Sequence, residues 1–263
     1  MDRFPSLFIS HGSPMIAITP NPAHHFLREL GPRLGRPRAI LIATAHWATV
    51  EPHVGTAVAP ETIHDFGGFP EALYALRYPA PGAPEIAARA GALLRAAGIA
   101  AGEEPARGLD HGSWIPALLM YPKADIPIAQ ISIQPAADPA HHHRIGEALR
   151  PLREEGVLIL GSGSFTHNLR AAFGLMRGGG AAETELPATA PFLAWIEVKV
   201  AAGDVSALLA YREGAPHMRE NHPTDEHFLP FFVALGAGTP GQAGERWHHS
   251  TDYGLAMDAY AFA

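Results

Sequence analysis

Residues 39–47 read Ala-Ile-Leu-Ile-Ala-Thr-Ala-His-Trp, and this stretch decides the fold. It opens with a short apolar run, residues 39–43, between loop-like flanks, which is typical of a fully buried strand. His46 and Trp47 follow at the point where the strand is expected to end. In an open α/β sheet, ligands bind beyond the carboxyl ends of the strands, so both side chains are candidates for a functional site.

Two other strand-like runs end in the same way. Residues 6–10 (Ser-Leu-Phe-Ile-Ser) lead into His11, and residues 157–166 lead into His167. The carboxyl ends of parallel strands meet at one edge of a sheet. We therefore expect the imidazoles of His11, His46 and His167 to converge on one point.

The order of helix and strand signals predicts the fold class. Asn21 suits an N-cap before a helix over residues 22–30, which joins the strands over residues 6–10 and 39–43 into a βαβ unit. Further patterns predict helices over residues 85–97, 138–153, 190–202 and 204–211, a short helix with Thr224 as its N-cap, a strand over residues 128–133, and a final strand or two over residues 246–263. We expect one three-layer α/β domain over residues 1–263, with a mostly parallel central sheet flanked by helices on both faces.

Composition narrows the classes of partner and site. The chain has 263 residues, a net charge of −7 and no basic patch with interleaved aromatic residues, so we expect no nucleic-acid partner. No apolar run approaches the roughly 18 residues that span a bilayer, and the N-terminus lacks a secretory core, so we expect a cytoplasmic protein without membrane contact. Cysteine is absent, so any metal must be held by His, Asp or Glu.

The histidine content is unusual, because the chain contains 16 histidines against 19 lysines and arginines together. Those in residues 24–25, 141–143 and 248–249 are expected to be exposed surface clusters. The isolated histidines that follow apolar runs, such as His11 and His46, are the better candidates for chemistry.

Two histidines stand beside an aspartate. Asp110 precedes His111, and two alternatives stay open: Asp110 orients the imidazole, or another nearby carboxylate keeps the ring charged. His64 and Asp65 repeat the pairing within residues 53–84, a loop-rich stretch that we interpret as a rim or lid over the site.

The third ligand of a metal site stays open at this stage. His227 follows Asp225 and Glu226, and because neighbours on a helix point about 100° apart, only one of the three can be the ligand. Two imidazoles with one carboxylate are typical of non-haem Fe(II) oxygenases, whereas three imidazoles with an open position are typical of catalytic zinc. The sequence contains no HExxH, GxSxG or Walker A motif.

Six short motifs occur together in one order. They are residues 10–14 (Ser-His-Gly-Ser-Pro), 45–47 (Ala-His-Trp), 63–70 (Ile-His-Asp-Phe-Gly-Gly-Phe-Pro), 110–114 (Asp-His-Gly-Ser-Trp), 166–170 (Thr-His-Asn-Leu-Arg) and 226–230 (Glu-His-Phe-Leu-Pro). In this order they resemble the 4,5-DOPA extradiol dioxygenases, a branch of the LigB-type (class III) extradiol ring-cleavage enzymes. The resemblance covers residues 6 to about 235 of the chain.

The resemblance implies an enzyme that opens a catechol such as L-DOPA at its 4,5 position with O2, giving a product that can cyclise to betalamic acid. It implies an Fe(II) cofactor, with Zn(II) as an occupant of the purified protein. The implied metal ligands are His11, His46 and His227. The wider class has a carboxylate as third ligand, so Glu226 stays an alternative to His227.

The resemblance also implies roles for the remaining residues. His167 would be the acid/base histidine, and a fourth ligand in a metal-substituted form, while His111 would be a second catalytic histidine that faces the substrate. The implied substrate contacts are His64, Asp65, Trp47 and Ser13. For the carboxylate of an amino-acid tail, Arg170 and Arg77 are candidates.

Two other functions stay compatible with the same residues. A zinc-dependent amide or ester hydrolase would use three histidines as ligands and His167 as base. A non-catalytic LigB-like binding protein would not retain a metal. The expected partners of the enzyme are a small catechol and O2, and we expect a monomer or a homodimer.

Overall fold

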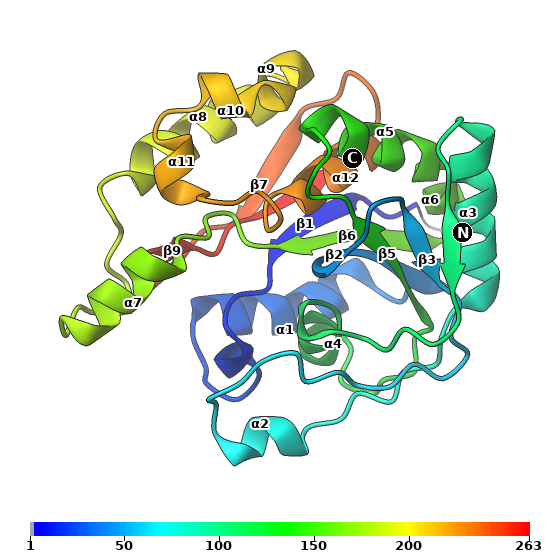
Figure 1. Ribbon diagram of the computed structural model, residues 1–263, viewed down its shortest axis with the longest axis horizontal. Helices are drawn as coiled ribbons and strands as arrows, with labels where there is room; N and C mark the ends of the chain where they lie inside the picture. Colours follow the sequence, from blue (N-terminus) through cyan, green and yellow to red (C-terminus); the bar gives the residue numbers. More distant parts are fainter. Residues whose placement is uncertain (1–2) are drawn as a thin grey trace.

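The structure is a computed structural model that describes residues 3–263. At its centre is an eight-stranded sheet in the order β4-β3-β5-β2-β6-β1-β10-β7 (Figure 1). The four central strands are β5 (Ile128–Ile133), β2 (Ala39–Ala48), β6 (Val157–Gly163) and β1 (Ser6–Ser10), and they pair in parallel. The predicted α/β class with a mostly parallel sheet is confirmed.

Shorter strands complete both edges of the sheet. At one edge, β10 (Ala259–Phe262) and β7 (Gly244–His248) run antiparallel, so the C-terminal tail supplies strands as predicted. At the other, β3 (His53–Gly55) pairs antiparallel with β5 and parallel with β4 (Gly102–Glu104). A separate two-stranded ribbon consists of β8 (Thr251–Asp252) and β9 (Leu255–Ala256).

Helices cover both faces of the sheet because the central strands are apolar on both sides. On one face, α1 (Pro22–Leu34) and α4 (His111–Met120) pack against side chains such as Ile40 and Ile42 of β2. On the other, Leu41 of β2 lies in a core shared with α3 (Pro84–Ala96), α5 (Pro139–Leu149) and α12 (Leu229–Ala237). Figure 1 shows α1 and α4 below the sheet, α5 and α12 above it, and α3 at its right-hand side.

An aromatic core extends the second layer toward the tail. Phe8 of β1 contacts Phe165, Phe228 and Phe231, and α8 (Thr189–Ala201) joins this cluster through Phe192. The remaining helices are short: η1 (Pro14–Ala17), α2 (Glu71–Ala75), α6 (Pro151–Glu154), α7 (Leu169–Arg177), α9 (Val205–Leu209), α10 (Tyr211–Gly214) and α11 (Met218–Asn221). None of the helices of residues 3–263 has the length and apolarity that a bilayer crossing requires.

Local capping signals place several helix starts correctly. Asn21 and Asp138 accept hydrogen bonds from the backbone N–H groups of His24 and His141, at 2.8 and 2.7 Å, so both are N-caps as their sequence context suggests. The predicted helix over residues 138–153 is nevertheless divided, because Pro151 has no N–H to continue the ladder.

The predicted N-cap at Thr224 is wrong. Helix α12 begins at Leu229, after Phe228, and the Thr224 hydroxyl donates to Glu226 Oε1 at 3.1 Å instead. The segment before α12 is therefore a turn and not the start of the helix. This turn contains Glu226 and His227, which belong to the site described below.

Two of the histidines expected on the surface are buried. His24 donates through Nδ1 to the Ile16 carbonyl at 2.7 Å, and His142 accepts the Gln134 N–H at Nε2 at 3.1 Å. Their neighbours in the same runs, such as His25, are exposed or half-buried. The expectation that all of these histidines are exposed is wrong at these two positions. Successive residues of a helix point in different directions, so His24 and His142 face the interior while the histidine beside each of them faces outward.

Two glycines of β6 let the segment around α12 approach the sheet. A side chain at Gly161 would collide with the Pro230 carbonyl, and one at Gly163 would collide with the His227 carbonyl. The close approach is held by a hydrogen bond from the Ser164 N–H to the His227 carbonyl at 2.9 Å. The two glycines at the end of this strand therefore determine where His227 lies.

Candidate metal centre

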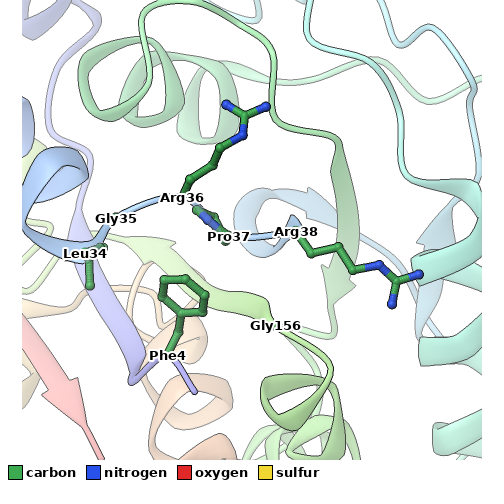
Figure 2. Close-up of a pocket in the computed structure, with 7 residues that line it drawn as sticks. All are labelled: Phe4, Leu34, Gly35, Arg36, Pro37, Arg38 and Gly156. Carbon is green, nitrogen blue, oxygen red and sulfur yellow. The ribbon is translucent and has the colours of Figure 1, made fainter. Parts of the chain in front are cut away.

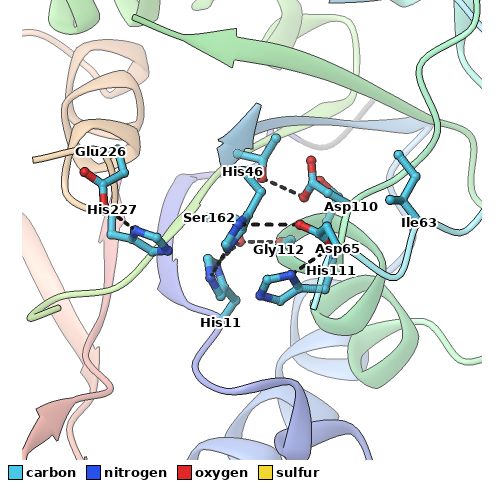
Figure 3. Close-up of polar contacts among 12 residues, drawn as sticks. His11, His46, Ile63, Asp65, Asp110, His111, Gly112, Ser162, Glu226 and His227 are labelled. Atoms are coloured by element: carbon cyan, nitrogen blue, oxygen red, sulfur yellow. Dashed lines mark hydrogen bonds and ion pairs between the residues drawn. The ribbon is translucent and has the colours of Figure 1, made fainter. Parts of the chain in front are cut away.

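Five histidines line one cavity at the carboxyl edge of the central strands. His11 follows β1, His46 lies in the last part of β2, and His111 is the first residue of α4. His167 follows β6 and His227 precedes α12. The predicted convergence of His11, His46 and His167 at this edge is therefore confirmed, and Figure 3 shows His11, His46, His111 and His227 pointing toward one another.

The strand that carries His46 is longer than expected. It continues to Ala48 instead of ending at residue 43, and its pairing with β5 shifts register between Ala43 and Ala48. This irregularity lies beside the end of the pairing with β6, at Thr44. A bulged strand end re-aims its side chains, and here the imidazole of His46 faces His11.

Three of the rings can share one ion. Nitrogen atoms of His11, His46 and His227 all lie within 4.8 Å of one another, and the two Nε2 atoms of His11 and His46 are 3.0 Å apart. Metal–nitrogen bonds are about 2.0–2.1 Å long, so two nitrogens on a common ion lie roughly 3 Å apart. A nitrogen of His227, and not an oxygen of Glu226, lies in this close group with His11 and His46.

Hydrogen bonds on the opposite side of each ring assign the tautomers. Ser162 donates its hydroxyl to the Gly112 carbonyl, so it accepts from His11 Nδ1–H, at 3.1 Å. His227 Nδ1 donates to Glu226 Oε1 at 3.1 Å. Both rings then keep a lone pair on Nε2. His46 Nδ1 faces Asp65 Oδ2 at 3.5 Å, so the Nε2 lone pair of His46 faces that of His11. A cation bound between the two nitrogens would remove the repulsion of these lone pairs.

Burial lowers the pKa values of the clustered imidazoles. It lowers the pKa of His46 to about 2 and that of His167 to about 3, with a further contribution from the neighbouring rings. The pKa values of His11 and His227 are lowered too, again chiefly by burial. At neutral pH these rings are uncharged and carry lone pairs, which is the form that binds a metal ion.

Asp65, and not Asp110, orients His111. Its Oδ1 accepts both the backbone N–H of His111 at 2.9 Å and Nδ1–H at 3.0 Å. Burial raises the pKa of Asp65, but the hydrogen bonds from His111 outweigh this and hold it at about 2. The alternative in which the adjacent Asp110 does this is wrong, because its side chain turns away from the ring as α4 begins.

Asp110 instead supports the end of β2. The buried carboxylate accepts hydrogen bonds from Thr44 Oγ1 at 2.8 Å, Gln130 Nε2 at 2.9 Å and Arg107 at 3.0 Å. Thr44 in turn accepts the His46 N–H at 3.2 Å. Asp110 therefore acts on the site through the backbone that carries His46.

His167 lies against His227. The two rings stack with centroids 3.5 Å apart and an angle of 14° between their planes. His167 Nδ1 lies 3.8 Å from Glu226 Oε1, and within residues 3–263 its Nε2 has no hydrogen-bond partner. Nitrogen and oxygen atoms of His167, Glu226 and His227 form a second close group, as do those of His46, Asp65 and His111.

The cavity above the histidines has a volume of about 510 Å³ and mostly apolar walls. Ser13 lines it close to His11, and the loop over residues 53–84 contributes Phe66 and Phe69 as the predicted rim. The remaining walls come from α7 and from the segment around β9; their side chains are Leu169, Ala172, Phe173, Met176, Leu255 and Met257. The spacing of the four α7 residues is that of one helix face, a signal in the sequence that we did not use.

Several predicted contacts lie outside the cavity wall. His64 donates to the Leu76 carbonyl at 3.1 Å and packs against Trp114, while Trp47 is buried beneath the Arg107 guanidinium at 5.4 Å. Arg77 donates to the same Leu76 carbonyl, and Arg170 is exposed on α7. Neither arginine lines the cavity.

A second, smaller cavity of about 290 Å³ lies at the opposite edge of the sheet, where β2 and β6 begin. Phe4, Arg36 and Gly156 are among its lining residues (Figure 2). Its lining residues within the described part of the chain include neither a histidine nor a carboxylate. The candidate metal-binding and acid/base residues therefore lie in the histidine-lined cavity.

Comparison with known proteins identifies the class. Residues 5–262 match the family described as the catalytic LigB subunit of aromatic ring-opening dioxygenase, and the chain belongs to this family. It is 41% identical to the 4,5-DOPA dioxygenase extradiol of Beta vulgaris, over 98% of this chain and 96% of the relative. It is 40% identical to the protein of the same name from Escherichia coli (strain K12), over 89% of this chain and 85% of the relative.

A solved structure agrees with these relatives. The crystal structure of the uncharacterized protein JW3007 from Escherichia coli K12 superposes with a TM-score of 0.80 and 30% sequence identity, covering 99% of this chain and 100% of that one. The family resemblance seen in the motifs is thus confirmed, and the names of the relatives support an extradiol ring-cleavage dioxygenase.

Proposed function

We propose that the protein opens a catechol such as L-DOPA at the 4,5 position with O2, using non-haem Fe(II) held by His11, His46 and His227. The observation that carries this proposal is the meeting of three uncharged imidazoles, from distant parts of the chain, with their nitrogens within 4.8 Å of one another. Two further histidines border the same cavity, which supplies acid/base groups beside the ligands.

The donor set fits such an ion. Bound there, Fe(II) would act as a Lewis acid toward the catechol hydroxyls and supply the redox chemistry that O2 requires. Three imidazoles fit Zn(II) equally well, but zinc has no redox chemistry. We therefore expect zinc to fill the site of the purified protein without supporting ring cleavage.

His167 is proposed to take the proton of a catechol hydroxyl. Its Nε2 is free and the ring borders the cavity, so the nitrogen can accept a proton from a hydroxyl within hydrogen-bond reach. Glu226 lies 3.8 Å from Nδ1, and its carboxylate would stabilise the imidazolium that results. His167 can later return the proton to the opened product.

His111 is proposed to accept a hydrogen bond from a hydroxyl of the substrate. Its Nδ1–H is held by Asp65, so the ring orientation is fixed before any ligand enters and Nε2 is the free atom. The aromatic rings of Phe66 and Phe69 border the same cavity and exclude water from the reacting ring. A positioned ring, a proton acceptor and a dry cavity together favour reaction within the site.

The proposal is tested by loading the protein with Fe(II) without air and then adding L-DOPA and air. A yellow product that absorbs visible light, formed with uptake of O2, is expected. Absence of ring cleavage for every catechol of a panel, by protein that is fully loaded with iron, would refute the proposal. The Zn(II)-loaded protein is the control, and amide or ester hydrolysis by that sample would favour the hydrolase instead.

A further inference from the structure

The charge of the cavity wall bears on the substrate that it accepts. Among residues 3–263, no lysine or arginine lines the cavity, and Asp252, on β8, is the one carboxylate that does. Leu255 and Met257, three and five positions later, are part of the same wall. Asp252 therefore places a carboxylate beside a space that is otherwise bordered mainly by apolar side chains and imidazoles.

The carboxylate of Asp252 is not used by the fold. The side chain is half-buried, and within residues 3–263 it makes neither a hydrogen bond nor an ion pair with another side chain. Burial raises its pKa, and the nearby charge of Glu183 raises it further. A carboxylate kept in apolar surroundings without a partner is costly, and a bound cation would offset that cost.

The same wall provides no partner for an anion. Arg77 and Arg170, the two arginines considered for a substrate carboxylate, lie outside the cavity. A negatively charged tail would enter a site with no cationic side chain and would meet Asp252 at close range. An ammonium group on the tail would be attracted to the same residue.

We propose that the site selects catechols that carry an alkylammonium tail and that Asp252 receives this ammonium group. This inference rests on the proposed ring cleavage. The tail carboxylate of an amino acid is not recognised. The catechol end binds at the histidines, which leaves the opposite, positively charged end for Asp252. Dopamine is then at least as good a substrate as L-DOPA, and a catechol with only a carboxylate on its tail is the poorest.

The first test compares four catechols on the Fe(II)-loaded wild type and on Asp252→Asn. The probes are dopamine, L-DOPA, uncharged 4-methylcatechol and 3-(3,4-dihydroxyphenyl)propionate. Loss of a charge-assisted hydrogen bond should raise KM for the two amines about tenfold or more, while kcat changes little. KM for 4-methylcatechol should not change, and KM for the propionate should fall.

Binding without turnover gives a second readout. In the Zn(II)-loaded protein, calorimetry should give a Kd for dopamine that rises about tenfold in Asp252→Asn, with no change for 4-methylcatechol. Glu183→Gln is the matched control, because Glu183 is exposed and outside the cavity wall although its charge acts on Asp252. This variant should leave both constants within about twofold of the wild type, since it removes no contact.

The possible outcomes distinguish failure of the proposed ring cleavage from failure of the proposed role of Asp252. If no catechol is cleaved, the proposed function fails, and the calorimetric comparison alone decides the role of Asp252. If catechols are cleaved but KM for 4-methylcatechol rises as much as KM for dopamine, Asp252 is structural and the inference is overturned. A wild type that prefers the propionate to dopamine overturns it without any variant.

Discussion

Two imidazoles of the site are held by partners that lie far away in the sequence, whereas His227 is held by its neighbour Glu226. Ser162 holds His11, and Asp65 holds His111. Such outer contacts decide which nitrogen carries the proton and in which direction the lone pair points. At the scale of single residues, the chemistry therefore depends on these pairs as much as on the histidines themselves.

Substitution of Glu226 tests whether this residue binds the metal itself or only orients His227. If it only orients His227, Glu226→Gln should weaken metal affinity by about 10- to 100-fold, because the amide still accepts from Nδ1–H but carries no charge. Metal titration of the purified apoprotein measures the change. A loss of metal as complete as that in His227→Ala would instead make Glu226 a ligand.

Alanine variants should separate ligands from acid/base groups. His11→Ala and His46→Ala each remove one of three nitrogens that face a common point, so neither variant should retain the metal through gel filtration. His167→Ala should retain it and lose turnover by about 100-fold or more, the range of a general acid/base group. Metal content and O2 uptake are measured on the same samples. An empty site in His167→Ala would make that residue a ligand.

At the scale of elements, the site depends on two strand ends and one close approach. The bulged end of β2 turns His46 toward His11, and the Asp110 cluster supports that end. On the other side, β6 ends in glycine so that the turn before α12 can lie directly on the sheet. These elements bring His227 to His11 and His46, which follow or end the first two strands.

Gly163→Ala should therefore damage both stability and metal binding. Its methyl group would collide with the His227 carbonyl, which is backbone and cannot rotate away. Overpacking of this kind costs about 1–3 kcal/mol, and the displaced turn should also weaken metal affinity. Denaturant unfolding and metal titration measure the two effects.

Gly174→Ala is the matched control for that variant. Gly174 is exposed on α7, and a side chain there would meet no atom of another element within 4 Å. Alanine favours a helix over glycine by about 1 kcal/mol, so this variant should be as stable as the wild type or slightly more so. Equal losses in both variants would contradict the steric argument.

At the scale of the whole molecule, two apolar layers on one sheet make the site a product of complete folding. The histidines at positions 11, 46 and 227 meet only when β1, β2 and α12 are packed together. The layers also bury polar side chains that ordinarily stay at the surface, such as His142 between Asp138 and Gln134. Such groups make the stability of the fold depend on pH.

His142 should destabilise the protein in mild acid. Burial lowers its pKa from 6.5 to about 4, and its Nε2 already accepts the Gln134 N–H, so the folded state resists protonation. Its contribution is complete above pH 6.5 and is lost as the pH falls toward 4, because the unfolded chain takes up the proton first. The total loss is about 3 kcal/mol.

His142→Gln measures this contribution, because an amide oxygen can accept the same N–H without titrating. The free energy of unfolding should fall less steeply between pH 6.5 and 4 in the variant, by up to about 1.4 kcal/mol per pH unit. Identical slopes in the two proteins would show that His142 is not the titrating group.

The periodicity of apolar residues and the histidines that follow the strand-like runs sufficed to predict the α/β fold and the position of the site. Short-range signals such as the N-caps Asn21 and Asp138 were also correct, since a capping bond joins residues only a few positions apart. The order of the six motifs sufficed for the family. These features depend on local geometry or on the linear order of residues.

The tertiary structure alone decided which distant side chains meet. It paired His111 with Asp65 and not with its neighbour Asp110, buried His142, and left His64 outside the cavity wall. It also brought Asp252, from the last part of the chain, to the wall of a cavity whose histidines begin at position 11. Such contacts arise when two layers of helices pack onto one sheet. The pattern of residues within one segment does not determine where that segment lies relative to another, so these contacts could not be predicted from it.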